Sequence, residues 1–174
     1  NGIDYAGKYH IAYNDLDNLL EDNFIPLKNI WDEIGSRVVI KSDSIDIFNI
    51  NGNNFTIKMN DNNKDGYIIF SEIFKVGHKY AIYYNVKANS NYNFSIRLYN
   101  MGWAQHIINA QQTANVVATD TIIVSINTNG QFSIDLTSEN NGSEFTGTLK
   151  VYDITGLDNI VETFDFENLK DETV

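Results

Sequence analysis

The chain has 174 residues, of which 43% are hydrophobic, so it is long enough and apolar enough to fold as one domain with a substantial core. It contains no cysteine, which excludes disulfides, cysteine-based zinc sites and a thiol nucleophile. The formal net charge of −11 and the absence of an apolar run of about 18 residues argue against nucleic-acid binding and against membrane insertion.

The first 35 residues show no strand rhythm, although the stretch "YNDLDNLLEDNF" could form a helical turn. Because the sequence begins Asn1-Gly2 with no methionine or secretory pattern, we expect it to be a piece of a longer protein. We divide it into a leading segment or linker (1–17), a folded domain (18–160) and an acidic C-terminal tail or linker (161–174).

From about Arg37 onwards, hydrophobic and polar residues alternate in short runs, the pattern of strands with one buried face. Segments rich in Asn and Gly separate these runs, namely "NGNN", "DNNKDG", "NSNYN", "TNG" and "ENNGS". The apolar positions of the runs are 55, 57 and 59; 80, 82, 84, 86 and 88; 94, 96 and 98; 122, 124 and 126; and 132, 134 and 136. About eight or nine such strands predict an all-β sandwich or barrel.

The segment "DNNKDGYIIFSE" (61–72) has the ligand spacing of a calcium-binding EF-hand loop, with Asp61, Asn63 and Asp65 at alternate positions, Gly66 sixth and Glu72 twelfth. An EF-hand needs a helix on each side, but both flanks alternate like strands. We therefore interpret "NDNNKDG" as the turn of a β-hairpin. Calcium binding in another geometry stays the weaker alternative.

The sequence gives little indication of catalysis or of a cofactor. His10, His78 and His106 are scattered with no partner at metal-ligand spacing, and there is no Gly-x-Ser-x-Gly elbow or phosphate-binding glycine loop. We therefore expect a binding protein rather than an enzyme, with no cofactor unless calcium binds.

The exposed aromatic residues indicate a ligand site. If "NSNYN" closes a hairpin between strands 79–88 and 93–100, Tyr83 lies opposite Tyr99, and Asn85 lies opposite Arg97. Trp103 would follow in the loop "NMGWAQH", beside His106. Aromatic rings next to amide and guanidinium groups suit a sugar, because rings stack on C–H faces while polar groups bind hydroxyls.

We therefore predict ligand binding by Tyr83, Asn85, Arg97, Tyr99 and Trp103. The alternative is a cross-strand tyrosine pair on a solvated face, with no ligand. The net negative charge predicts that strongly anionic polymers bind less well than neutral glycans, unless Arg97 and Lys87 create a local positive patch.

Three stretches resemble tail and baseplate proteins of bacteriophages that infect low-GC Gram-positive bacteria. "IIFSEIFKVGHKYAIYYNVKA" resembles a strand, a Gly-His-Lys-Tyr-type turn and a long second strand of that family. "LKVYDITGL" is similar to its closing strand, and "DNLLEDNF" followed by Trp31 is similar to its first segment. The resemblance implies a jelly roll like that of carbohydrate-binding modules, used for attachment to cell-wall glycan, and the shared motifs look structural.

We therefore expect a two-sheet antiparallel jelly roll that binds a cell-surface polysaccharide. The resemblance implies a place in the virion, other tail or baseplate proteins as partners, and a possible homotrimer. Two alternatives stay open: a structural spacer or trimerisation module of a tail fibre, and an extracellular or cell-surface module from a bacterial surface protein or polysaccharide-degrading enzyme.

Overall fold

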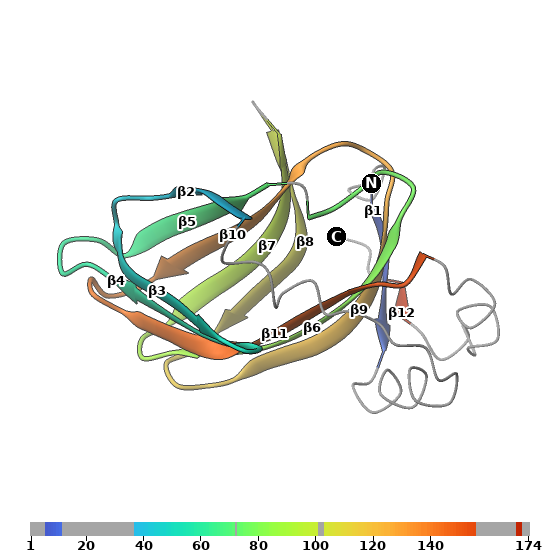
Figure 1. The fold of residues 1–174 in the computed structure, drawn as a ribbon. Helices are drawn as coiled ribbons and strands as arrows, with labels where there is room; N and C mark the ends of the chain where they lie inside the picture. The colour runs from blue at the N-terminus through green and yellow to red at the C-terminus, as the bar shows by residue number, and fades with distance from the viewer. Residues whose placement is uncertain (1–5, 12–36, 72, 101–102, 156–169, 172–174) are drawn as a thin grey trace.

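A computed structural model describes residues 6–11, 37–71, 73–100, 103–155 and 170–171, which form twelve strands in two antiparallel sheets (Figure 1). The seven-stranded sheet has the order β12 (Lys170–Asp171), β1 (Ala6–Ile11), β9 (Ala118–Ile126), β6 (Lys79–Ala88), β11 (Glu144–Asp153), β4 (Asn54–Met59) and β3 (Ile45–Asn51). The five-stranded sheet has the order β2 (Val38–Lys41), β5 (Asp65–Phe70), β10 (Gln131–Ser138), β7 (Tyr92–Asn100) and β8 (Trp103–Gln112).

The predicted fold class, an antiparallel two-sheet sandwich, is confirmed, with ten of the strands between residues 37 and 155. None of the described residues belongs to a helix that is long and apolar enough to cross a membrane. Most of the predicted leading segment and of the acidic tail lies outside the described residues, so the proposed division at 17 and 160 stays a prediction.

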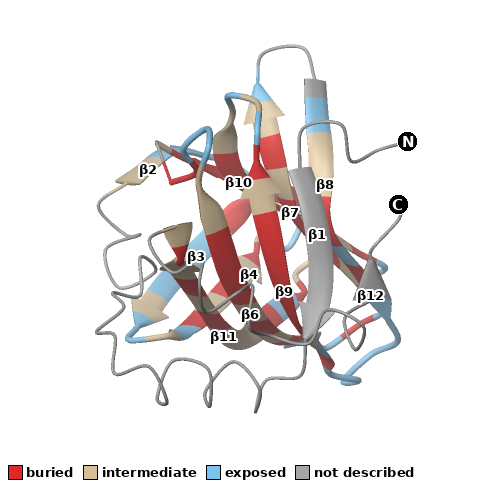
Figure 2. Ribbon diagram, turned by 90° about the vertical axis from the view of Figure 1, so that its right-hand side faces the viewer, coloured by how far each residue is buried: buried red, intermediate tan, exposed pale blue. Residues whose placement is uncertain are grey.

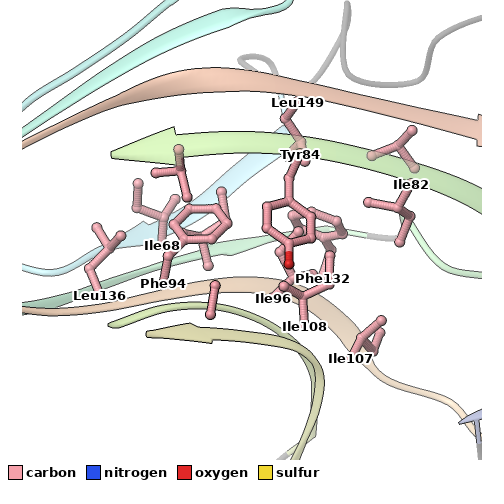
Figure 3. Close-up of a cluster of buried hydrophobic side chains, with 14 of the residues drawn as sticks. Ile68, Ile82, Tyr84, Phe94, Ile96, Ile107, Ile108, Phe132, Leu136 and Leu149 are labelled. Atoms are coloured by element: carbon pink, nitrogen blue, oxygen red, sulfur yellow. The ribbon is translucent and has the colours of Figure 1, made fainter. Parts of the chain in front are cut away.

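The core lies between the two sheets, and the alternating residues predicted to be inward are buried there. Ile82 and Tyr84 of β6 point from one sheet towards Phe94 and Ile96 of β7 in the other (Figure 3). The rings of Tyr84 and Phe94 are stacked, with centroids 6.4 Å apart. Figure 2 shows that much of β9 is buried as well. Its apolar run Ile122, Ile123 and Val124 is buried on both faces of the strand.

The segments predicted as turns do connect strands, but most of them join strands of different sheets. At the predicted turn "NGNN", Gly52, with φ of 61°, closes a hairpin between β3 and β4. The turns at 60–64, 89–91, 127–130 and 139–143 instead carry the chain from one sheet to the other. The prediction that "NDNNKDG" closes a hairpin is therefore wrong in this respect: β4 pairs with β3 and β11, whereas β5 pairs with β2 and β10.

The segment that matches an EF-hand loop follows strand β4, and its residues 65–70 form strand β5, so the turn that the sequence predicts is confined to residues 60–64. Its geometry comes from Asn60, whose Oδ1 accepts hydrogen bonds from the Asn62 N–H at 3.0 Å and from the Asn63 side-chain amide at 2.6 Å. Asp61 lies 3.8 Å from the Lys58 ammonium. The described residues include no cluster of three or more His, Asp or Glu side chains suited to a metal. Calcium binding by Asp61, Asn63 and Asp65 stays the weaker alternative.

The prediction that "NMGWAQH" forms a loop is wrong, because Trp103 begins the long edge strand β8. A register shift beside Ile96 and Arg97 places both Ile107 and Ile108 in buried positions. This irregularity breaks the alternation that would have revealed the strand.

Candidate functional site

The five predicted ligand-binding residues do not share one face. Tyr83 and Asn85 lie on β6, which pairs with β9 and β11, and they alternate with the core residues of the seven-stranded sheet. Arg97 and Tyr99 lie on β7, which pairs with β8 and β10, on the outer face of the five-stranded sheet. The predicted cross-strand pairs are therefore wrong.

The error has a simple physical cause. The "NSNYN" turn crosses between sheets, so the buried faces of β6 and β7 look towards each other and their polar faces look in opposite directions. Tyr83 is flanked by Thr121 of β9 and Lys150 of β11, and the Lys150 Nζ lies 5.9 Å from the centroid of its ring. Trp103 lies opposite Asn100 at the start of β8, and its side chain is outside the described residues.

The outer face of the five-stranded sheet brings Arg97 and Tyr99 together with residues that sequence reasoning missed. Arg97 lies between Ser133 of β10 and His106 of β8, whereas Tyr99 lies between Gln131 and Ala104. One row further along, Ser95 lies opposite Asp135 and donates a hydrogen bond to the Asn109 side chain at 3.1 Å. We call this outer surface of β5, β10, β7 and β8 the polar face.

An ion pair lies at the centre of the polar face. The Arg97 guanidinium donates a hydrogen bond to Asp135 Oδ1 at 3.4 Å, and the two side chains are 20% and 30% exposed. Burial raises the pKa of Asp135, and the positive charges of Arg97 and His106 only partly oppose this rise. Arg97 Nε and the Oγ of the fully buried Ser133 have no hydrogen-bond partner among the described residues. Polar groups buried without partners are uncommon.

Two pockets lie at opposite ends of the polar face. The first, of about 420 Å³, is lined by Asn91, Tyr92, Asn93, Gln111, Gln112, Thr113, Thr137, Ser138 and Glu139. We call it the amide pocket. The second, of about 660 Å³, is lined by Ser71, Phe74, Lys75, Val76, Tyr99, Asn100, Asn129, Gly130 and Gln131. We call it the tyrosine pocket. Strands β7 and β10 contribute to both, so they run from one pocket to the other.

The Gly-His-Lys-Tyr turn and the Asp-Ile-Thr segment, far apart in sequence, form one structural cluster at the start of β6 and the end of β11. His78 Nδ1 lies 2.7 Å from Asp153 Oδ2, while the Thr155 hydroxyl and N–H donate to Asp153 Oδ1. Thr155 Oγ1 in turn accepts the Lys79 N–H at 3.0 Å. Because these groups satisfy one another and hold the two strands together, the cluster supports a structural role.

This cluster makes stability depend on pH. Burial raises the pKa of Asp153, but hydrogen bonds from Thr155 and His78 outweigh burial and leave the pKa below its ordinary value. A carboxylate with a depressed folded-state pKa contributes stability above its unfolded pKa of about 3.9, and that contribution is lost as pH falls through the folded value. We expect Asp153→Asn to cost about 1–2 kcal/mol at pH 7.

Thermal unfolding of the wild type and Asp153→Asn between pH 7 and pH 2.5 measures this effect. The difference in Tm should be largest at neutral pH and should shrink below about pH 4. Asp46→Asn, at an exposed position of β3, serves as the control for removal of one surface charge. An Asp153→Asn deficit that is equally large at pH 2.5 would contradict the ionic origin of the contribution.

No family model matches the chain, and no curated protein matches it. Among solved structures, the chain is similar to a CBM4 carbohydrate-binding module, with TM-score 0.45 and 13% identity over 63% of this chain and 76% of that chain. It is also similar to a CBM29-2 mutant complexed with mannohexaose, with TM-score 0.42 and 12% identity over 74% of this chain and 93% of that chain. At these TM-scores and identities, the similarity supports no conclusion about a ligand.

Proposed function

We propose that the domain binds a polysaccharide chain along the polar face, without catalysis. The observation that carries the proposal is the pair of pockets at the two ends of β7 and β10, with the Arg97–Asp135 pair between them. From Asn93 to Tyr99, six steps along an extended strand span about 20 Å, which accommodates several linked sugar rings.

The side chains of the polar face offer the interactions that a sugar chain requires. Tyr99 lines one pocket, and Tyr67, which is 40% exposed, lies opposite Asp135 near the centre of the face. Their rings can stack on the C–H faces of sugars, while Arg97 and Asp135 offer a donor and an acceptor to neighbouring hydroxyls. Trp103 begins the edge strand next to Tyr99, and its participation stays a prediction.

Binding by a single module should be weak. Stacking on one tyrosine contributes roughly 0.5–1.5 kcal/mol beyond the area buried. We therefore expect a Kd on the order of 0.1–1 mM, equivalent to about 4–5.5 kcal/mol. Several copies presented together would raise the apparent affinity without any new contact.

The biological setting that we propose is attachment of a phage tail or baseplate to host cell-wall glycan. The resemblance of "GHKY" and its flanking strands to such proteins supports this setting, including the virion location, the tail-protein partners and a homotrimer. A tail-fibre spacer and a module from a bacterial surface protein or polysaccharide-degrading enzyme are the alternatives.

Tyr83 and Tyr99, both predicted from the sequence to bind the ligand, provide a matched test. Tyr99→Ala changes the polar face, whereas Tyr83→Ala removes the same side chain, also half-buried, from the opposite sheet. A multimerised domain should be retained on purified cell walls of low-GC Gram-positive bacteria. We expect Tyr99→Ala to weaken retention about three- to tenfold, corresponding to the stacking contribution, and Tyr83→Ala to leave it unchanged.

Three outcomes would contradict the proposal. If both folded variants bind like the wild type, the polar face around Tyr99 is not the site. If only Tyr83→Ala loses binding, the site lies on the seven-stranded sheet with Asn85. If the wild type binds no wall preparation at all, the spacer function should replace glycan binding.

A further inference from the structure

The amide pocket has a rigid wall. The Asn91 side chain donates to Glu139 Oε2 at 2.7 Å and accepts the Ala114 N–H at 3.0 Å, so it links the turn before β7, the end of β10 and the β8–β9 connection. The backbone closes the same contact, because the Glu139 N–H donates to the Asn91 carbonyl at 2.8 Å. Beneath the wall, the buried Tyr92 hydroxyl bonds the carbonyls of Val86 and Val116 at 2.9 and 2.6 Å. A ligand would therefore meet a preformed surface.

The chemistry of the lining is that of a site for uncharged hydroxyl groups. Four side-chain amides, those of Asn91, Asn93, Gln111 and Gln112, provide donors and acceptors together. Glu139 is the one residue with a formal charge among the described residues that line the pocket. Its carboxylate can accept a hydrogen bond from a hydroxyl, but it repels a second anion.

The charges outside the pocket do not reverse this preference. Asp65 lies opposite Thr137, next to the pocket, and adds negative charge. Lys64, whose carbonyl accepts the Ser138 N–H and hydroxyl at 2.9 Å, adds one positive charge beside Asp65, so these two charges offset each other. On the polar face itself the nearest positive charge is Arg97, and Asp135 compensates it at 3.4 Å. Lys87 belongs to β6 in the other sheet, so the local positive patch of Arg97 and Lys87 considered from the sequence does not form.

We infer that the amide pocket takes an uncharged sugar unit and that Glu139 excludes sugars bearing carboxylate, sulfate or phosphate groups. This inference rests on the proposed glycan-binding function of the polar face and adds the charge class of its ligand. It predicts that a single neutralising substitution relaxes selectivity without weakening the binding of neutral chains.

Glu139→Gln is the variant that tests the inference, since a glutamine oxygen can still accept the Asn91 hydrogen bond. Glu144→Gln is the matched control, because it makes the same change in net charge at an exposed position of β11 in the other sheet. The experiment compares how far each polymer retards the wild type and the two variants in native gels at low salt. The polymers are mannan and mixed-linkage glucan, which are neutral, and polygalacturonate, which is acidic.

We expect Glu139→Gln to bind polygalacturonate about fivefold more tightly than Glu144→Gln does, equivalent to about 1 kcal/mol for unit charges roughly 4 Å apart in water. The gain should shrink in 0.5 M salt, and binding of the neutral polymers should stay within about twofold of the wild type. Equal gains in polygalacturonate affinity in both variants, or no gain in Glu139→Gln, would overturn the inference. The proposed function would still stand if the neutral polymers bind and Tyr99→Ala weakens that binding. If no polymer retards any protein although cell walls retain the wild type, the inference falls and the proposed function stands. If cell walls retain nothing either, both fall.

Discussion

Gly147→Ala is expected to destabilise the domain by about 3 kcal/mol or more, because a methyl group at this position would collide with backbone that cannot move on its own. Gly147 lies on the central strand β11, opposite Phe55 of β4 and Val86 of β6. A β-carbon there would lie 2.1 Å from the Asn85 carbonyl oxygen and 2.9 Å from the Phe55 ring. Relief would require both strand pairings to shift.

Thermal and urea-induced unfolding measure this effect, with Thr146→Ala as the control on the outward face of the same strand. For a chain of this size, about 3 kcal/mol corresponds to a decrease in Tm of roughly 6–12 °C. Thr146→Ala should change the free energy of unfolding by less than about 1 kcal/mol. A Gly147→Ala protein as stable as this control would show that β11 adjusts more freely than its two partners suggest.

Phe132→Ala is the second substitution with a large expected effect, about 3–5 kcal/mol. Phe132 is fully buried, and the centroid of its ring lies 5.5 Å from that of Phe70 and 5.1 Å from that of Phe74. Removing the ring leaves a cavity that two aromatic neighbours, each held by its own strand or turn, cannot fill. Urea unfolding should show a lower midpoint with an unchanged slope.

Phe132→Leu provides the comparison for Phe132→Ala. Leucine keeps most of the buried apolar volume, so its cost should be well below that of alanine. If the two variants were equally destabilised, loss of the aromatic contacts with Phe70 and Phe74, rather than the cavity, would account for the effect.

The sequence pattern was sufficient to predict the core. Alternation identified Tyr84, Phe94 and Phe132 as inward residues, and all three are buried between the sheets. A side chain that alternates with solvent positions must enter the core whichever strand lies next to it, so this inference needs no knowledge of strand pairing.

Strand pairing could not be predicted in the same way. Asn and Gly form a turn by adopting particular backbone angles, whether the next strand returns beside the first at about 4.8 Å or in the opposite sheet at about 10 Å. The segment "NSNYN" is compatible with both. The assumption of a hairpin placed Tyr83 opposite Tyr99, although the two residues lie on opposite outer surfaces.

The candidate site was therefore only half predictable. Arg97 and Tyr99 were recognised as outward residues of one strand, but Asp135 and Gln131 come from β10, more than thirty positions away. The alternation in "QFSIDLTSE" does indicate that they face outward. Only the order of strands in the sheet, set by long-range packing, shows that they lie beside β7. Glu139 was missed because it follows the strand in a turn segment.

The position of β11 has a consequence for how the chain can fold. This strand lies between β6 and β4, and it is the only described connection in the sheet between the β3–β4 hairpin and the β6–β9 pair. Among the described strands it is also the last long one along the sequence. During synthesis, the two halves of the sheet must wait with open edges until residues 144–153 have left the ribosome. Contacts between such distant segments close slowly, so the nascent domain stays exposed to edge-to-edge association until β11 inserts at the centre.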